Sequence, residues 1–343
     1  MKRTILSLAA FVCCSLGVFA QTDLVATLSH GSNLTTYNGI DALSEAYNAA
    51  AEGDVITLSP GTFNAVNIEK AITVRGAGMM PLESNGSVTT SLTGSFSINV
   101  STSSSSVPTL EGLLALDPVS VYGESLAPVN LMKCRFQSSV EGCGVYMNAT
   151  YCVFASSLNA SHYRDGYRNT TLNCINCVIN NATCSGLSDS VVGKIQATNC
   201  IVKAENPVPY STFNNCLFLG FYAYAILDVT CSVHSCYGIN MYETPDLFTN
   251  INDTSNKMLD GSGNDVVQSV FKTLTSWGNF QLTETFELTD AAAASYLGDD
   301  GKQVGIYGGP TPFDPVPNNP QVKKFVVDSS TESGKLKVKI NVE

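Results

Sequence analysis

The sequence is poor in charged residues, in histidine and in tryptophan. Lysine and arginine number 18 and aspartate and glutamate 29, so charged residues make up only 14% of the 343-residue chain, which has three histidines and one tryptophan. Amphipathic helices need a polar, usually charged face, so few such helices are expected. Serine, threonine, asparagine and glycine are frequent instead, which favours sheets joined by many turns.

Long apolar runs are absent after residue 20, so we expect no membrane insertion of the remaining chain. The start has the form of a signal peptide: basic residues 2–3 precede an apolar stretch, and Val18-Phe19-Ala20 offers small residues at the cleavage positions. A lipid anchor at Cys13 or Cys14 is disfavoured by the residues before them. We predict a signal peptide over residues 1–20 and an exported protein, in the periplasm, on the outer surface or outside the cell.

The charge balance limits the partners. Cleavage after residue 20 would remove two of the 18 basic residues and none of the acidic ones, which takes the formal charge from −11 to −13. Such a chain disfavours nucleic acid and anionic membranes as partners. A highly acidic polysaccharide is also a less natural ligand unless a local basic site exists. We expect a monomer.

Cysteines mark an internal repeat of about twenty residues. The segments KCRF, YCVF, NCVI, NCIV, NCLF and SCYG align with one another, and their cysteines lie 16 to 25 residues apart. The aligned cysteines are Cys134, Cys152, Cys177, Cys200, Cys216 and Cys236. Two earlier segments, TGSF and EGLL, fit the same pattern with Gly94 and Gly112 in the cysteine position.

Apolar residues recur at fixed places around these cysteines, which indicates short strands. Two places after the cysteines stand Phe136, Phe154, Ile179, Val202, Phe218 and Gly238, and three places before them stand Leu131, Ala149, Cys174, Ala197, Phe213 and Val233. Side chains alternate along a strand, and strands this short can bury one face only by stacking turn on turn. The repeat therefore predicts an all-β solenoid, a parallel β-helix in which the cysteines form a buried column.

Three states are open for the ten cysteines after the signal peptide. Small thiols pack well in a tight column, and we favour stacked, mostly reduced cysteines. Disulfides are the second possibility, because an exported protein meets oxidising conditions. Cys143 and Cys184 are the best candidates because they belong neither to the cysteine column nor to the set of residues three places before it. A zinc site at Cys174 and Cys177 is disfavoured because no second pair with ligand spacing accompanies them, so we expect no metal site.

A conspicuous motif, GDVITLSPGTF, occupies residues 53–63, and an amphipathic helix is predicted just before it, near residues 41–51, with Asp41 as N-cap. Together they resemble the entry segment of the right-handed parallel β-helix proteins of the pectin-lyase-like superfamily, where a helix caps the open end of the solenoid. The resemblance is to exported bacterial members. It implies a single right-handed β-helix domain over residues 21–310.

The end of the chain changes in composition. Residues 300–309, DGKQVGIYGG, resemble the closing turn of bacterial β-helix proteins. Proline-rich residues 311–320 are expected to form an extended linker, and the alternating pattern of residues 321–343 predicts a C-terminal two-strand hairpin tail. Asp299 and Asp300 allow a weak calcium interpretation, but turn residues are the simpler one, and we expect no cofactor.

Residues two and four places before each cysteine point outward and form one readable face. They are Asn130, Asn148, Asn173, Gln196, Thr212 and Ser232, with Met132, Thr150, Ile175, Thr198, Asn214 and His234 beside them. The enzymes of the superfamily that this chain resembles are polysaccharide lyases and glycoside hydrolases, which need titratable groups in an outward groove. Only His234 qualifies. Asn148, Asn173 and Gln196 are candidates for binding sugar hydroxyls, or else they satisfy one another.

A dense polar cluster, SHYRDGYRN over residues 161–169, falls in the longest gap between aligned cysteines and is expected to protrude as a loop. Tyr163, Arg164 and Tyr167 combine aromatic surface with charge and are candidate glycan ligands. Candidate catalytic residues are His162, Arg164, Asp165 and Arg168. An Arg–Asp pair that only holds the loop is the simpler interpretation.

Two functions remain open from the sequence. The favoured one is an exported or cell-surface β-helix without catalytic activity, which binds an extracellular glycan or polysaccharide or serves a structural role at the surface. The alternative is a polysaccharide lyase or glycoside hydrolase with a site around residues 162–168.

Overall fold

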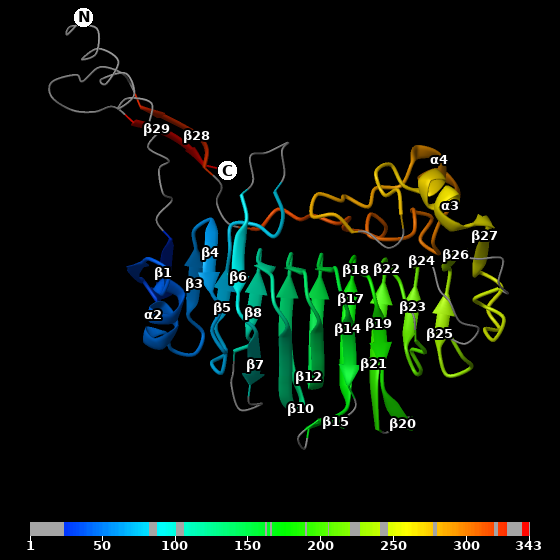
Figure 1. Ribbon diagram of the computed structural model, residues 1–343, viewed down its shortest axis with the longest axis horizontal. Helices are drawn as coiled ribbons and strands as arrows, with labels where there is room; N and C mark the ends of the chain where they lie inside the picture. The colour runs from blue at the N-terminus through cyan, green and yellow to red at the C-terminus, as the bar shows by residue number, and fades with distance from the viewer. Residues whose placement is uncertain are drawn as a thin grey trace, which may run out of the picture.

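The structure is a computed structural model that describes residues 24–81, 88–100, 106–161, 163–164, 167–188, 191–204, 206–219, 227–240, 246–276, 280–318, 322–327 and 338–342. They form an all-β solenoid of about eight turns with parallel sheets, which confirms the predicted fold class (Figure 1). The predicted signal peptide lies outside the described residues.

Each turn gives one strand to a first face and, after a tight bend, one strand to a second face. The first face stacks β3 (Val55–Leu58), β5 (Thr73–Arg75), β8 (Thr109–Glu111), β10 (Val119–Met132), β12 (Val140–Thr150), β17 (Thr170–Ile175), β21 (Val191–Thr198), β23 (Thr212–Asn214) and β25 (Ser232–His234). The second face stacks β4 (Gly61–Asn64), β6 (Thr90–Thr93), β9 (Leu114–Ala115), β11 (Arg135–Phe136), β13 (Val153–Phe154), β18 (Val178–Ile179), β22 (Ile201–Val202), β24 (Leu217–Leu219), β26 (Tyr237–Asn240) and β27 (Lys257–Ser262).

A third, shorter face covers the middle turns. The first halves of β10 and β12 pair there with β7 (Phe96–Val100) and β14 (Leu158–Ser161), and β14 pairs with β19 (Ala182–Cys184). One short strand, β20 (Gly186–Ser188), pairs antiparallel with the start of β21.

The bend between the first and second faces is made by one residue with positive φ, directly before each aligned cysteine. These residues are Lys133, Tyr151, Asn176, Asn199, Asn215 and Ser235, with φ between 50° and 56°. Asparagine tolerates this left-handed conformation better than most residues, which explains the recurrent Asn-Cys dipeptide. The next side chain then points inward, and this places the cysteine in the core.

The six aligned cysteines form the predicted column, because all are at most 1% exposed and successive turns are hydrogen-bonded through sulfur. The Cys152 and Cys177 backbone N–H groups donate to the Sγ atoms of Cys177 and Cys200, each at 3.4 Å. Each thiol in turn donates to a main-chain oxygen; Cys177 Sγ, for example, lies 3.4 Å from the oxygen of Ala149. Phe136 and Phe154, two places on, stack with ring centroids 5.2 Å apart.

All ten cysteines of the described residues are free thiols, the state favoured from the sequence, and the two disulfide candidates Cys143 and Cys184 are not bonded. Cys184 lies instead against Ser211, with Sγ and Oγ 3.5 Å apart. Burial raises the pKa of Cys184 to about 12 and that of the column thiols Cys134 and Cys152 well above the ordinary thiol value.

The two glycines aligned with the cysteines were assigned wrongly. The pairing of Met132 with Glu111 and of Arg135 with Leu114 puts Gly112 level with the bend residue Lys133, so Leu113 takes the cysteine position. Gly112 has φ 65°, and a Cβ there would meet Pro317 at 2.9 Å. Gly94 lies beyond β6, whose first residue Thr90 occupies the cysteine position. In both turns glycine marks a bend rather than the column.

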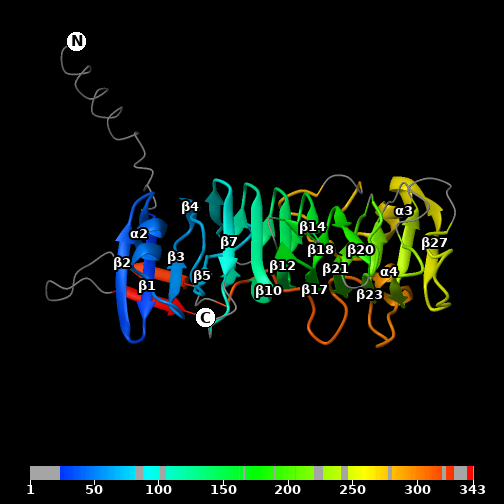
Figure 2. The same cartoon turned by 90° about the horizontal axis from the view of Figure 1, so that it is seen from below.

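Helix α2 (Ala42–Ala49) covers one end of the solenoid, as predicted, and buries Ala42, Leu43 and Ala46 (Figures 1 and 2). Asp41 takes the N-cap position, although its side chain makes no capping hydrogen bond. An antiparallel hairpin that the sequence did not reveal, β1 (Val25–His30) and β2 (Asn33–Asn38), extends the first face at this end through the pairing of β1 with β3.

The turns end at Ser262 rather than near residue 310. The following chain, which we call the strap (residues 263–276 and 280–318), contains α3 (Gly263–Val270) and α4 (Asp290–Ser295) and runs back along the solenoid, the orange segment in Figure 1. Residues 300–309, expected to close the solenoid, and 311–318, the described part of the expected linker, belong to the strap. Tyr151 Oη donates to Thr311 O, and Lys133 Nζ lies 2.7 Å from Asp314 Oδ2.

The strap covers the outside of the second face and builds a second apolar core there. Outward residues of the second face are Val153, Val178, Ile201, Leu217 and Tyr237, and strap residues packed on them include Val267, Phe271, Phe286, Val304 and Ile306. The outside of the first face has no such cover in the described chain. The C-terminal tail is the predicted antiparallel hairpin of β28 (Val322–Val327) and β29 (Val338–Val342).

Candidate functional site

The amides proposed as sugar ligands on the first face hydrogen-bond one another. Asn148 Nδ2 donates to Asn130 Oδ1, and Asn173 Nδ2 donates to Asn148 Oδ1, both at 3.2 Å. Gln196 lies level with Asn173 on one side and Thr212 on the other. These bonds correspond to the ladder of mutually bonded amides that the sequence left open, and each uses one of the two N–H groups of the donating amide.

The polar cluster at residues 161–169 contains a short antiparallel hairpin of β15 (Tyr163–Arg164) and β16 (Tyr167–Arg168). Tyr163 pairs with Arg168 and Arg164 with Tyr167. The hairpin lies beside β10 and β12, at the foot of the solenoid in Figure 1. His162 and Asp165 lie outside the described residues, so the roles suggested for this cluster stay predictions.

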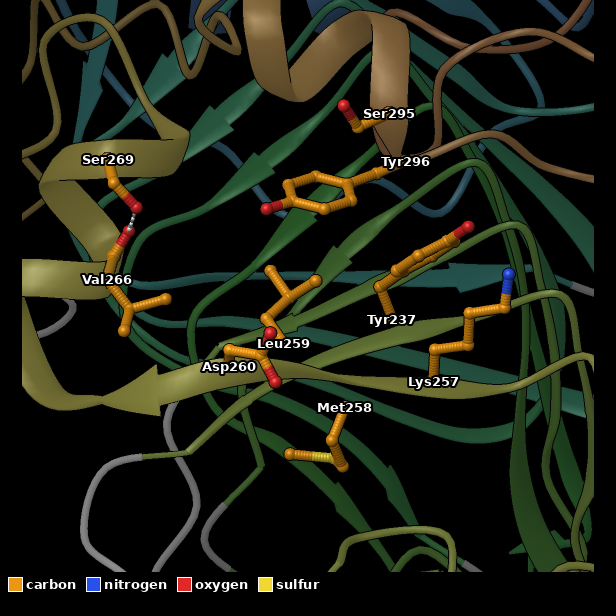
Figure 3. A pocket seen from close by; sticks show the side chains of 9 residues that line it. All are labelled: Tyr237, Lys257, Met258, Leu259, Asp260, Val266, Ser269, Ser295 and Tyr296. Atoms are coloured by element: carbon orange, nitrogen blue, oxygen red, sulfur yellow. Dashed lines mark hydrogen bonds between the residues drawn. The ribbon is translucent and has the colours of Figure 1, made fainter.

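A pocket of about 290 Å³ opens at the far end of the solenoid, where the strap begins (Figure 3). Its walls come from β26, β27, α3 and the end of α4, and its lining residues are Tyr237, Lys257, Met258, Leu259, Asp260, Val266, Ser269, Ser295 and Tyr296. We call it the double-tyrosine pocket. None of the lining residues is among the candidate ligands or catalytic residues that the sequence analysis named.

Two tyrosine rings define this pocket. The Tyr237 and Tyr296 centroids lie 5.3 Å apart with the ring planes tilted by 47°. Tyr237 is 5% exposed and its hydroxyl donates to the main-chain oxygen of Leu297 at 3.3 Å, which fixes the ring. Tyr296 is half-buried, and Figure 3 shows its hydroxyl directed toward the space between Ser269 and Leu259.

Charged groups line the pocket on the β27 side. Lys257 Nζ lies 5.9 Å from the Tyr237 ring centroid, and Asp260 follows three residues later. Both residues are exposed, and neither makes an ion pair with a described residue. A cation, a carboxylate and the serine hydroxyls around an aromatic floor can orient a polar ligand that also has an apolar face.

His234, the one titratable residue on the readable first face, lies at the neighbouring corner. Its Nδ1 is 2.7 Å from Asp253 Oδ2, and its Nε2 is 3.8 Å from Asp299 Oδ2. Hydrogen bonds from Ser255 and then from His234 lower the pKa of Asp253 to about 2. Asp299, which allowed a calcium interpretation, uses its other oxygen to accept from Asn215 Nδ2 at 2.7 Å.

A second pocket of about 380 Å³ lies on the other side of α4, with Lys272, Glu287, Asp290, Gln303 and Tyr307 in its lining. Lys272 Nζ lies 3.3 Å from Asp290 and 3.4 Å from Glu287. Asp290 and then Glu287 raise the pKa of Lys272. Because these charges already pair with one another, this pocket offers a ligand less than the double-tyrosine pocket does.

Within the described part of the chain, no group of three or more histidine, cysteine or acidic side chains is arranged to hold a metal ion. Among the same residues, no helix has the length and apolar character needed to cross a membrane. No protein-family model matches the sequence, and no curated protein matches it either.

Proposed function

We propose that this chain is an exported, non-catalytic, right-handed parallel β-helix of the pectin-lyase-like type that binds an extracellular glycan in the double-tyrosine pocket. The pairing of Tyr237 with Tyr296 carries the proposal. The leader-like residues 1–20 support export to the periplasm, the outer surface or the medium. A structural surface role is compatible with the same binding.

The pocket suits one or two units of a saccharide. Its volume lies at the lower end of the range of ligand pockets, roughly 300–1,000 Å³. Aromatic faces offer apolar contact to the C–H faces of a sugar ring, while Lys257, Asp260 and Ser269 are placed for its hydroxyl groups. Tyr237 is held by Leu297 O, so little conformational entropy is lost there when a ligand binds.

The groups that surround the pocket support the non-catalytic part of the proposal. Acid–base cleavage of a glycosidic bond by the common mechanism uses two carboxyl groups close together. Among the described residues that line the double-tyrosine pocket, Asp260 supplies the one carboxylate. The first face offers mainly amides and hydroxyls, which do not ionise near neutral pH and are therefore poor general acids and bases.

Binding is tested with residues 21–343 on a glycan array, followed by calorimetry with the strongest hit. Tyr296→Ala should weaken binding about tenfold, which corresponds to about 1.4 kcal/mol. Lys272→Ala, at the second pocket, is the matched control and should bind like the wild type. We propose binding without a cofactor, so EDTA should change nothing. Equal affinity of Tyr296→Ala and wild type would remove this pocket from consideration.

A polysaccharide lyase or glycoside hydrolase is the second candidate. One observation favours it: Asp253 accepts from Nδ1 of His234, which leaves Nε2 as a possible base. The site around residues 162–168 is the other location. Ultraviolet absorbance of unsaturated products and assays of new reducing ends on pectins, alginates and glycosaminoglycans cover both reactions. Turnover that disappears in His162→Ala or His234→Gln would replace the non-catalytic proposal.

A further inference from the structure

His234 joins three separate segments at the end of the solenoid. It is the last residue of β25; Asp253 belongs to the loop that follows β26, and Asp299 belongs to the strap. The two carboxylates are the charged groups that face the imidazole from the described elements packed against it. Ser255 Oγ, 3.3 Å from Nδ1, is an uncharged neighbour.

Asp299 is fixed to the solenoid at one oxygen and turned to His234 with the other. Asn215 Nδ2 donates to Asp299 Oδ1 at 2.7 Å, and the Asp299 backbone N–H donates to Asn215 Oδ1 at 3.1 Å. The strap residues just before Asp299 belong to the pocket: Leu297 O accepts from the Tyr237 hydroxyl, and Tyr296 forms a wall. The His234 corner and the pocket therefore share one short piece of strap.

The protonation state of the His234 imidazole determines whether its Nε2 can donate a hydrogen bond to Asp299. A neutral imidazole has one N–H group. When Nδ1 carries this hydrogen and donates it in a hydrogen bond to Asp253, 2.7 Å away, the lone pair on Nε2 faces the Asp299 carboxylate. A protonated imidazole donates from both nitrogens and carries a positive charge between two carboxylates. Imidazole is the side chain that ordinarily changes charge between pH 5 and 8.

We propose that protonation of His234 fastens the strap at Asp299 and with it the Tyr296 wall, so that the pocket holds its saccharide more tightly in mildly acidic surroundings than at pH 8. This regulation rests on the proposed glycan binding. An exposed ion pair is a small effect, so the expected gain in affinity from pH 8 to pH 5.5 is about two- to fivefold. His234 is a positioning residue here and need not touch the ligand.

The structure supplies a matched control for this device. His30, at the opposite end of the solenoid, also pairs with a carboxylate, with Nδ1 2.8 Å from Asp54 Oδ1. His30→Gln removes a histidine–aspartate pair far from the pocket, whereas His234→Gln removes the one beside it. The chain has three histidines in all, so few other imidazoles change charge between the two pH values at which the variants are compared.

Two measurements test the proposal at pH 5.5 and 8. Hydrogen exchange, corrected for the intrinsic rate at each pH, follows the strap around residues 296–304 without ligand. Calorimetry uses the uncharged probes cellohexaose, xylohexaose and hexa-N-acetylchitohexaose, which do not titrate themselves. We expect slower exchange and two- to fivefold tighter binding at pH 5.5 in the wild type and in His30→Gln, and no such difference in His234→Gln or Asp299→Asn.

The outcomes separate the two proposals. If hydrogen exchange in the strap is equally fast at both pH values, or if His234→Gln keeps the difference in exchange, the proposed role of His234 protonation is wrong, independent of glycan binding. If the exchange difference follows His234 but no probe and no array glycan binds at either pH, the device stands and the glycan function is wrong.

Discussion

Asn176 donates its side-chain amide to the main-chain oxygen of Ile306 at 2.6 Å, across 130 residues of sequence. The same amide reaches Gly308 O at 3.0 Å. Asn176 is also a bend residue with φ 50°. One side chain thus serves both the turn between two faces and the attachment of the strap.

Other bend residues also contact the strap, and their partners follow one another in order along it. Going up the solenoid, Lys133 contacts Asp314, Tyr151 contacts Thr311, Asn176 contacts Ile306 and Asn215 contacts Asp299. The strap therefore runs opposite to the stacking direction and is attached turn by turn. Its apolar side chains cover the second face between these attachments.

The double role of Asn176 predicts a graded pair of variants. Asn176→Gly keeps the left-handed bend but leaves the oxygens of Ile306 and Gly308 without their donor, so unfolding free energy should fall by about 1–3 kcal/mol. Asn176→Ala should cost about 1–2 kcal/mol more, because alanine is disfavoured at positive φ. Urea denaturation measures both. Ser235→Gly, at a bend of φ 50°, is the control and should be neutral or slightly stabilising; equal stability of the two Asn176 variants would contradict the double role.

The cysteine column predicts protected thiols. Cys200 is fully buried and its thiol donates to Cys174 O at 3.3 Å, so iodoacetamide should label it in the native protein only as fast as the protein unfolds. Cys200→Asp should destabilise by several kcal/mol, because it buries a charge without a partner. Cys200→Ser retains a donor and should cost much less. Rapid labelling of Cys200 in the folded state would refute the column.

The buried Arg135 is predicted to tolerate replacement by an apolar side chain of similar size. It is 0% exposed under the strap; Nη2 donates to Phe280 O and Gln281 O, but Nε and Nη1 have no partner among the described residues. Burial lowers the pKa of Arg135 to about 10, partly offset by Glu284. A folded-state pKa below the ordinary arginine value means that the charged form weakens the fold at neutral pH. Arg135→Met removes the buried charge but also the donor to Phe280 O and Gln281 O, so its unfolding free energy should stay within about 1 kcal/mol of the wild type, while Arg135→Ala should lower it by about 2–5 kcal/mol by leaving a cavity. A loss of stability in Arg135→Met of the same size as in Arg135→Ala would show that the guanidinium contributes net stability.

The low pKa of Asp253 predicts that the stability of the protein depends on pH in the acidic range. Its pKa of about 2 lies below the ordinary aspartate value of roughly 3.9, so its contribution to stability is complete above pH 4 and is lost as the pH falls through about 2. Urea denaturation should show Asp253→Asn destabilised at pH 6, with the difference from wild type closing toward pH 2. Ser255→Ala removes the main cause and should move the carboxyl titration, followed by NMR, upward. An unchanged titration in Ser255→Ala would assign the shift elsewhere.

The repeating part of the fold could be predicted from local sequence patterns. Alternation of side chains, a small buried residue at each cysteine position and the entry motif at residues 53–63 are local signals, and each recurs or is dense enough to be seen without knowing which turns touch. The register was correct wherever cysteine marked it. It was wrong at Gly94 and Gly112. Glycine is favoured at the bend, whereas cysteine occupies the buried column, and these two positions are one or more residues apart in the sequence.

The course of the strap and the position of the candidate site depend on long-range packing and could not be predicted from the sequence. Residues 263–318 have no repeat, and their position is set by long-range contacts such as Asn176 with Ile306, whose polar partners are main-chain atoms without a sequence signature. Tyr237 occupies the same outward position as Val178 and Ile201, so the sequence showed a tyrosine in an apolar column. It became part of a pocket because the strap brings Tyr296 to within 5.3 Å, and a distance between residues about sixty positions apart is fixed by packing rather than by local pattern.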